Sequence, residues 1–454
     1  MSFFIRNKKP AATNNNSLKS KKRKFSEKPT KSKKTVKPDL DEELTSDEDD
    51  EGIGFDSQDF EEHSEVEEDL TEQERKVILA KKYLEEIEKV EKEKLNDSKD
   101  KHVLKKLETV VLEQEGKLRV NIADRLANAT VVCTKFNGKP HRASITCIAV
   151  TSDSKHVYSA CKDGIIIKWL LETRSKVCSS PFVKTDRKSY PPILALAVAN
   201  NNELVASGDN NSNIKLWSSS LEHLHTFTGH KAPITGLAIS FECDTLYSSS
   251  NDRSIKVWNI EDRAYVETLF GHQSAITSLD ILAKNRVISS GGTDKSVRVW
   301  KIQEESQLVF NGHSRGIDMT RRVNDQQFIT CGEDGTLSLW SILKKVPTHT
   351  IPVAHGYDSS SSEPNWITSV ACLHNSDLVA SGSYDGCVKL WKITPKRTLE
   401  FLQDIPLSGV INSLVFTSDH KHLVAGIGTE HRFGRWKTIK GVKNTVAIID
   451  IQLK

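Results

Sequence analysis

The residue types in this chain that could form a catalytic or metal-binding site recur as one ordered set: a His, then a Ser or Thr, then an Asp, then a Trp. Ser, His and Asp can form nucleophilic sites, and His and Asp can bind metals. The spacing predicts a structural network instead. In it the Asp accepts hydrogen bonds from turn amides and from the His, the His bonds the Ser or Thr, and the Trp indole donates. The predicted network is His230, Ser248, Asp252, Trp258, His272, Ser290, Asp294, Trp300, His313, Thr330, Asp334 and Trp340.

The elements that position these residues follow from the period of the set. An Asp, or once an Asn, stands six residues before a Trp six times, and the Trp residues recur every 40 to 51 positions. The pairs are Asp163/Trp169, Asn211/Trp217, Asp252/Trp258, Asp294/Trp300, Asp334/Trp340 and Asp385/Trp391. This is the period and signature of the WD repeat, in which each unit forms one four-stranded blade of a β-propeller.

A seventh unit is present in altered form. Residues 411–417, 422–426 and 445–451 have the β-branched alternation of strands. An insertion, residues 429–443, separates the last two of them. Residues 129–136 are rich in β-formers and are predicted to supply the outer strand of the last blade, which would close the ring and remove its open edges. The sequence thus predicts an all-β fold, a seven-bladed WD40 propeller.

The chain before the propeller divides into two further parts. Residues 1–38 contain thirteen Lys or Arg and one acid, and residues 39–69 contain seventeen acids and no Lys or Arg. Such blocks cannot bury a core, so residues 1–70 are predicted to be a disordered tail. Two basic clusters in it fit a two-part nuclear localisation signal, although a tail that only aids solubility would look similar. They comprise Lys21, Lys22, Arg23, Lys24, Lys31, Lys33 and Lys34.

Residues 71–118 form the helical stretch of the chain. Thr71 and Glu74 have the spacing of a capping box, and apolar residues then recur near helical spacing. Two interpretations remain open for this helical arm: it folds back on the propeller, or it docks on a partner. The propeller itself is assigned to residues 119–454.

The sequence argues against several classes of function. The eight cysteines show no CxxC motif and no metal-ligand spacing. No nucleophile–base pair, phosphate loop or ligand cluster stands outside the repeat network, so neither enzymatic activity, nor a cofactor, nor a small-molecule substrate is expected. Without a signal peptide or a long apolar stretch, the chain is expected to avoid membranes and to occupy a reducing compartment.

The insertion concentrates basic and aromatic residues. Phosphate binding needs Arg and Lys on one surface, and aromatic side chains can stack on bases. The candidate RNA contacts are His431, Arg432, Arg435, Lys437, Lys440 and Lys443, with Arg321 and Arg322 as a secondary site. The alternative is that Phe433 and Trp436 anchor the insertion to its blade while the charges are only solvated.

Segments outside the repeat core carry a more specific resemblance. They are residues 257–272, 300–310, 404–414 and 430–436 in the propeller, with 79–84 and 124–126 before it. They resemble the U3 small nucleolar RNA-interacting WD-repeat proteins, over about residues 71 to 451. Asn211 in place of Asp, and Ala354 in place of the usual Gly, are local departures.

The resemblance implies a component of the U3 small nucleolar ribonucleoprotein in the nucleus and nucleolus. The implied partners are the box B/C region of the U3 RNA, a small protein that binds the RNA kink-turn, and other processome proteins. The implied process is pre-ribosomal RNA processing and small-subunit biogenesis, with a role in assembly rather than cleavage. The alternative class is a nuclear WD40 adaptor of a ubiquitin ligase or a chromatin complex, which shares the fold and the charged tail.

Overall fold

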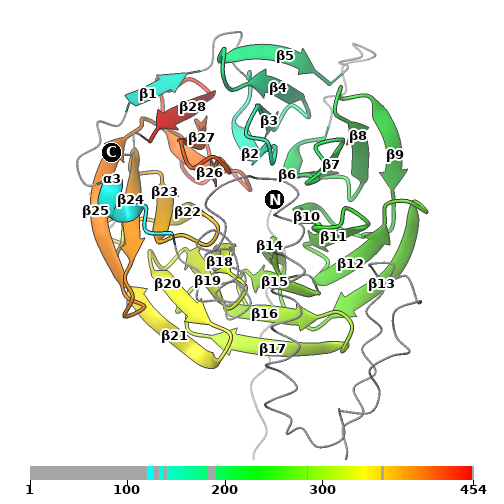
Figure 1. Ribbon diagram of the computed structural model, residues 1–454. Helices are drawn as coiled ribbons and strands as arrows, with labels where there is room; N and C mark the ends of the chain where they lie inside the picture. The colour runs from blue at the N-terminus through cyan, green and yellow to red at the C-terminus, as the bar shows by residue number, and fades with distance from the viewer. Residues whose placement is uncertain are drawn as a thin grey trace, which may run out of the picture. The chain divides into compact units, whose positions relative to one another are not determined.

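The computed structural model describes residues 120–126, 132–135, 141–180, 191–283, 285–358 and 362–451. Its strands form seven four-stranded antiparallel sheets arranged around a ring (Figure 1). The predicted seven-bladed propeller is therefore confirmed. The predicted tail at 1–70 and the helical arm at 71–118 lie outside the described residues. No helix in the described part of the chain is long and apolar enough to cross a membrane.

In each of the first six blades, four consecutive strands pair in chain order. Blades one and two comprise β2 (Ile145–Val150), β3 (His156–Cys161), β4 (Ile166–Leu170), β5 (Ser175–Ser179), β6 (Ile193–Val198), β7 (Leu204–Asp209), β8 (Ile214–Ser218) and β9 (His223–Phe227). Blades three and four comprise β10 (Ile234–Ile239), β11 (Thr245–Ser250), β12 (Ser254–Asn259), β13 (Ala264–Phe270), β14 (Ile276–Ala283), β15 (Arg286–Gly291), β16 (Ser296–Lys301) and β17 (Ser306–Asn311). Blades five and six comprise β18 (Ile317–Asn324), β19 (Gln327–Gly332), β20 (Leu337–Ser341), β21 (Lys344–Ile351), β22 (Ile367–Cys372), β23 (Leu378–Ser383), β24 (Cys387–Ile393) and β25 (Leu399–Pro406).

The seventh blade joins the two ends of the propeller. β26 (Val410–Phe416), β27 (His422–Gly428) and β28 (Thr445–Asp450) come from the end of the chain, and β1 (Val132–Lys135) comes from before the first blade. β1 pairs antiparallel with β28, from Val132 opposite Asp450 to Lys135 opposite Ala447. The described residues Val132–Lys135 thus make the closure expected for 129–136. This pairing covers the outer edge of β28 and joins the beginning of the propeller to its end.

Neighbouring blades are fastened by packing and by a repeated hydrogen bond. Apolar residues of adjacent sheets share cores, as where Ile145 and Ile148 of blade one meet Val424 and Val446 of blade seven. A Thr near the start of an inner strand also donates to the first residue of the next inner strand; for Thr235 and the carbonyl of Ile276 the distance is 2.6 Å. Thr146 and Thr277 make the same bond, and Thr368 donates to the carbonyl of Ile411, the second residue of its next inner strand. It satisfies a buried hydroxyl and holds the blades in register.

The segment before the propeller docks on blade six. The carboxylate of Asp377 accepts hydrogen bonds from the backbone N–H groups of Ile122, at 2.8 Å, and Ala123, at 3.0 Å. Ile122 precedes α3 (Ala123–Leu126) and Ala123 begins it, so the carboxylate satisfies amides that have no partner within so short a helix. Leu126 packs into the core between blades six and seven. Figure 1 shows α3 beside β24.

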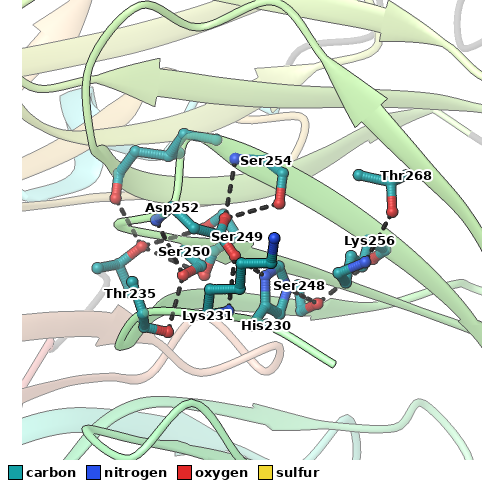
Figure 2. Close-up of polar contacts among 12 residues, drawn as sticks. His230, Lys231, Thr235, Ser248, Ser249, Ser250, Asp252, Ser254, Lys256 and Thr268 are labelled. Atoms are coloured by element: carbon teal, nitrogen blue, oxygen red, sulfur yellow. Dashed lines mark hydrogen bonds and ion pairs between the residues drawn. The ribbon is translucent and has the colours of Figure 1, made fainter. Parts of the chain in front are cut away.

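The repeat network is a continuous chain of hydrogen bonds, and Figure 2 shows His230, Ser248 and Asp252 of this chain in blade three. In blade three, His230 Nδ1 lies 2.8 Å from Asp252 and its Nε2 lies 2.8 Å from the Ser248 hydroxyl. The Trp258 indole donates to the same hydroxyl at 2.8 Å. The order Ser–His–Asp matches that of a catalytic triad, but Ser248 is fully buried and its oxygen already accepts from the indole. The arrangement therefore stabilises a turn and exposes no nucleophile.

One member of the predicted network, Ser290, and one predicted turn residue, Asn211, need correction. In blade four, His272 and Trp300 both bond the hydroxyl of Ser289, at 2.7 and 2.8 Å, and Ser290 instead bonds Thr277. The turn from this strand to Asp294 is one residue longer than in blade three, so the neighbouring serine faces the network. In blade two the turn acceptor is Asp209, which bonds the backbone N–H of Asn211 at 2.9 Å, rather than the side chain of Asn211.

Replacing Asp294 with Ala should lower the free energy of unfolding by about 1–3 kcal/mol, because its partners stay buried without an acceptor. Asp294 bonds His272 at 2.7 Å and the backbone N–H groups of Gln273 and Ser296 at 3.2 and 3.1 Å. Chemical denaturation of the full chain measures the loss. Asp244→Ala, at an exposed turn, is the matched control and should change stability by less than about 0.5 kcal/mol. Equal curves for the two variants would refute the role of the network.

Candidate nucleic-acid interface

The insertion, residues 429–443, leaves the seventh blade after β27 and returns to it at β28. Asn412, buried near the start of β26, holds its first turn. The Asn412 amide donates to the carbonyls of Ile145, at 2.8 Å, and Glu430, at 2.9 Å, and its oxygen accepts the backbone N–H of Arg432 at 3.0 Å. One buried side chain thus ties the insertion to blades one and seven, so the insertion starts from a fixed position.

Arg432 extends from the insertion to the other side of the ring. Its guanidinium donates to the backbone carbonyl of Asp318 at 2.8 Å, and that of Thr277 lies at 3.4 Å. These carbonyls belong to the inner strands of blades five and four. The guanidinium also stacks on the ring of Phe433 at 4.3 Å. Arg432 is only 4% exposed, so its guanidinium interacts with groups inside the protein and not with solvent.

Burial dominates the ionisation of the groups around this arginine. It raises the pKa of the Asp318 carboxyl to about 7, although the charge of Arg432 acts in the opposite direction. Burial, together with the charges of Arg432 and Lys162, lowers the pKa of His431 to about 3. The His431 imidazole is therefore neutral near pH 7.

The predicted RNA contacts of His431 and Arg432 are corrected by these positions. His431 is 5% exposed and packs against Trp436, with ring centroids 5.3 Å apart. A side chain enclosed in this way cannot reach a phosphate in solution. Both residues anchor the insertion, a role that the alternative interpretation had assigned to Phe433 and Trp436, and the charge pattern alone does not reveal this anchoring.

The other basic residues of the insertion are exposed. They are Arg435, Lys437, Lys440 and Lys443. The side chain of Arg435 is 83% exposed, and its Nε lies 2.9 Å from Glu430. Lys437 lies 2.8 Å from Asp358 and 4.0 Å from the centre of the Tyr384 ring. Lys440 and Lys443 have no ion-pair partner among the residues that the structure describes. They provide free positive charge next to a rigid anchor, as phosphate binding requires.

Two tryptophans that do not belong to the repeat meet at this surface. Six of the eight Trp residues occupy the repeat position, and the remaining two are Trp366 and Trp436. Their ring centroids lie 5.9 Å apart, and Trp436 is 63% exposed. Trp366 and Asn412 were not singled out by the sequence analysis. For Trp366 a signal existed, since a Trp outside a strict repeat has no blade-forming role to explain it.

Arg321 and Arg322 do not join this surface. They lie farther along β18 than Asp318 and line a separate cavity with Asp280 and His374. Arg322 stacks on the ring of Phe241 at 4.4 Å, and burial lowers its pKa. The two predicted RNA sites are therefore separate, and Arg322 has a structural contact of its own.

Comparison with known proteins identifies the family. The model for the WD domain, G-beta repeat, matches residues 132–169, 183–218, 221–259, 263–301, 304–341 and 354–392. A Homo sapiens protein named U3 small nucleolar RNA-interacting protein 2 is 44% identical over 394 residues, covering 84% of this chain and 82% of that protein. The chain belongs to the family of U3 small nucleolar RNA-interacting WD-repeat proteins.

Other members of the U3 small nucleolar RNA-interacting family agree with this assignment. A relative from Saccharomyces cerevisiae named Ribosomal RNA-processing protein 9 is 27% identical over 68% of this chain and 58% of its own length. The solved structure titled "Structure of U3-55K" has a TM-score of 0.67 and 44% identity, covering 70% of this chain and 98% of that one. These relatives do not favour the alternative of a ubiquitin-ligase or chromatin adaptor. The generic repeat matches end at residue 392, before the blade that carries the insertion.

Proposed function

We propose that this protein is a non-enzymatic component of the U3 small nucleolar ribonucleoprotein and that it binds the U3 RNA through the insertion of the seventh blade. The observation that carries the proposal is the set of exposed basic residues, Arg435, Lys437, Lys440 and Lys443, around the exposed ring of Trp436. The named relatives support the choice of RNA, since they are described as U3 RNA-interacting and ribosomal RNA-processing proteins.

The geometry supports RNA binding for a physical reason. Asn412 binds the backbone of the insertion, and the side chain of Arg432 binds the carbonyl of Asp318. Because these contacts already fix the insertion, RNA binding does not have to order it. A preorganised surface loses less entropy on binding. Exposed lysines beside an aromatic ring suit irregular, partly single-stranded RNA better than a regular duplex, because unpaired bases can stack.

The finer parts of the proposal rest on the family resemblance. They are binding at the box B/C region of the RNA, beside a small protein that binds the kink-turn, and action in pre-ribosomal RNA processing toward the small subunit. The proposed location is the nucleus and nucleolus. The basic clusters of the tail, which include Lys21 and Lys31, are proposed to direct import.

The RNA that accompanies the protein tests the proposal. The full chain is purified from nuclear extract under native conditions, and the co-purifying RNA is sequenced. U3 RNA should be enriched over other small nucleolar RNAs. Digestion of the U3 RNA with ribonuclease should release the kink-turn-binding protein from the complex. A complex without U3 RNA that contains ubiquitin-ligase or chromatin subunits would contradict the proposal and favour an adaptor.

A further inference from the structure

An aromatic pocket lies between the insertion and blade six. Its volume is about 170 Å³, and its lining includes Trp366, Tyr384, His431, Trp436 and Lys437. Pockets that enclose a drug-sized ligand are roughly 300–1,000 Å³. This pocket therefore has room for one ring system rather than for a whole nucleotide or a larger ligand.

The pocket contains an unused hydrogen-bond donor. His431 Nδ1 accepts the backbone N–H of Phe433 at 3.3 Å, so the proton of the neutral imidazole lies on Nε2. His431 Nε2 is buried and has no hydrogen-bond partner among the residues that the structure describes. A buried donor without an acceptor costs about 1–3 kcal/mol, so the His431 ring is held in the pocket wall by its packing against Trp366, at 6.3 Å between ring centroids, and Trp436, at 5.3 Å, rather than by a hydrogen bond at Nε2.

The charges around the pocket favour an anionic polymer. Two acids lie at the rim, but Asp358 pairs with Lys437 at 2.8 Å and Glu363 pairs with Arg315 at 3.1 Å. Both acids are thus already neutralised by the protein. Lys440 and Lys443 follow in the same insertion, and neither is paired with an acid in the described part of the chain. The surroundings of the pocket therefore suit an aromatic ring that belongs to a negatively charged polymer.

We propose that the aromatic pocket binds one unstacked nucleobase of the RNA, with the base against the Trp366 and Trp436 rings. The inference rests on the proposed function and deepens it. The lysines of the insertion bind phosphates without reading sequence, whereas the pocket selects a nucleotide that is unpaired and free to turn out of its stack. The pocket therefore recognises RNA structure, and the basic surface supplies general attraction.

Substituting Trp436 tests the stacking. The full chain is titrated with a U3 transcript, in the presence of the kink-turn-binding protein, at several salt concentrations. Trp436→Ala should weaken binding roughly 10- to 100-fold, as for loss of one base–aromatic stack. The slope of affinity against salt should not change, because no phosphate contact is removed. Trp436→Phe should restore most of the affinity. Phe270→Ala, which removes another exposed ring at 73% exposure, is the matched control and should bind like the wild type.

Abasic substitution identifies the nucleotide. Each unpaired nucleotide of the transcript is replaced by an abasic one, and one replacement should weaken wild-type binding as much as Trp436→Ala does. That replacement should have no further effect on Trp436→Ala, because both changes remove the same contact.

Two outcomes would overturn the inference, and they differ from failure of the proposed function. The first is Trp436→Ala binding the RNA like the wild type at every salt concentration, while charge reversal of Lys440 and Lys443 weakens it. The second is Trp436→Ala keeping the RNA but losing a protein partner, which would make the aromatic pocket a protein-binding site. If the wild-type chain itself does not bind U3 RNA, the proposed function fails as well.

Discussion

Replacing Arg432 with Met should lower the free energy of unfolding by about 3 kcal/mol, the largest stability effect expected for any residue of the insertion. The change keeps the length of the side chain but removes the donor to the Asp318 and Thr277 carbonyls. It also removes the positive charge that opposes the rise in the pKa of Asp318. Protonation of Asp318 would then avoid a lone buried charge, which limits the loss to this range.

Equilibrium denaturation of the full chain, followed by fluorescence, measures this effect. The matched control is Arg435→Met in the same insertion, where the side chain is 83% exposed and the expected change is below about 0.5 kcal/mol. If the two variants are equally stable, Arg432 does not fasten the insertion across the ring. The same reasoning makes charge reversal at Arg432 unsuitable as a test of RNA binding, since it would disrupt the insertion itself.

Reversing the charges of Lys440 and Lys443 should produce a large loss of U3 RNA affinity. With two phosphate contacts removed and repulsion added, affinity at moderate salt should fall roughly 10- to 100-fold. The slope of log affinity against log salt should become shallower by about two units, one for each contact. Stability should hardly change, because both side chains are exposed.

The control for this double variant keeps the same change in net charge. Lys344→Glu with Lys345→Glu alters two exposed lysines of β21, on the outer edge of blade five. It should leave both affinity and slope close to those of the wild type. Equal losses in the two double variants would show that only net charge matters, and the insertion would then not be the RNA-binding surface.

Local spacing predicted the fold well because the repeat is a local signal. Each Asp–Trp pair lies within one hairpin, so the sequence alone places the turns and the period of the blades. Ser290 was misassigned because a single extra residue in one turn changes which of two adjacent serines, Ser289 or Ser290, faces the network. Such a change leaves composition and period almost unaltered.

The site was predicted only in part because its anchors come from distant parts of the chain. Arg432 looks like a solvated or RNA-binding residue in a basic segment. Its partners, Thr277 and Asp318, are 155 and 114 residues away, and no local pattern connects them. Trp366 is likewise separated by seventy residues of sequence from Trp436, and only the folding of the blades into a propeller brings the two side chains together. The exposure of the lysines in the insertion needs no such distant partner and follows from their charge, whereas their contact with RNA stays a prediction.

Crosslinking within the assembled native particle tests the central claim most directly. Ultraviolet crosslinking followed by mass spectrometry would identify the peptides of this chain attached to U3 RNA, with sequencing of the same crosslinks locating the nucleotides. The predicted result is a crosslink to U3 RNA within residues 435–443, at or next to Trp436. Crosslinks confined to the cavity of Arg321 and Arg322, or the absence of any crosslink to U3 RNA, would contradict the account.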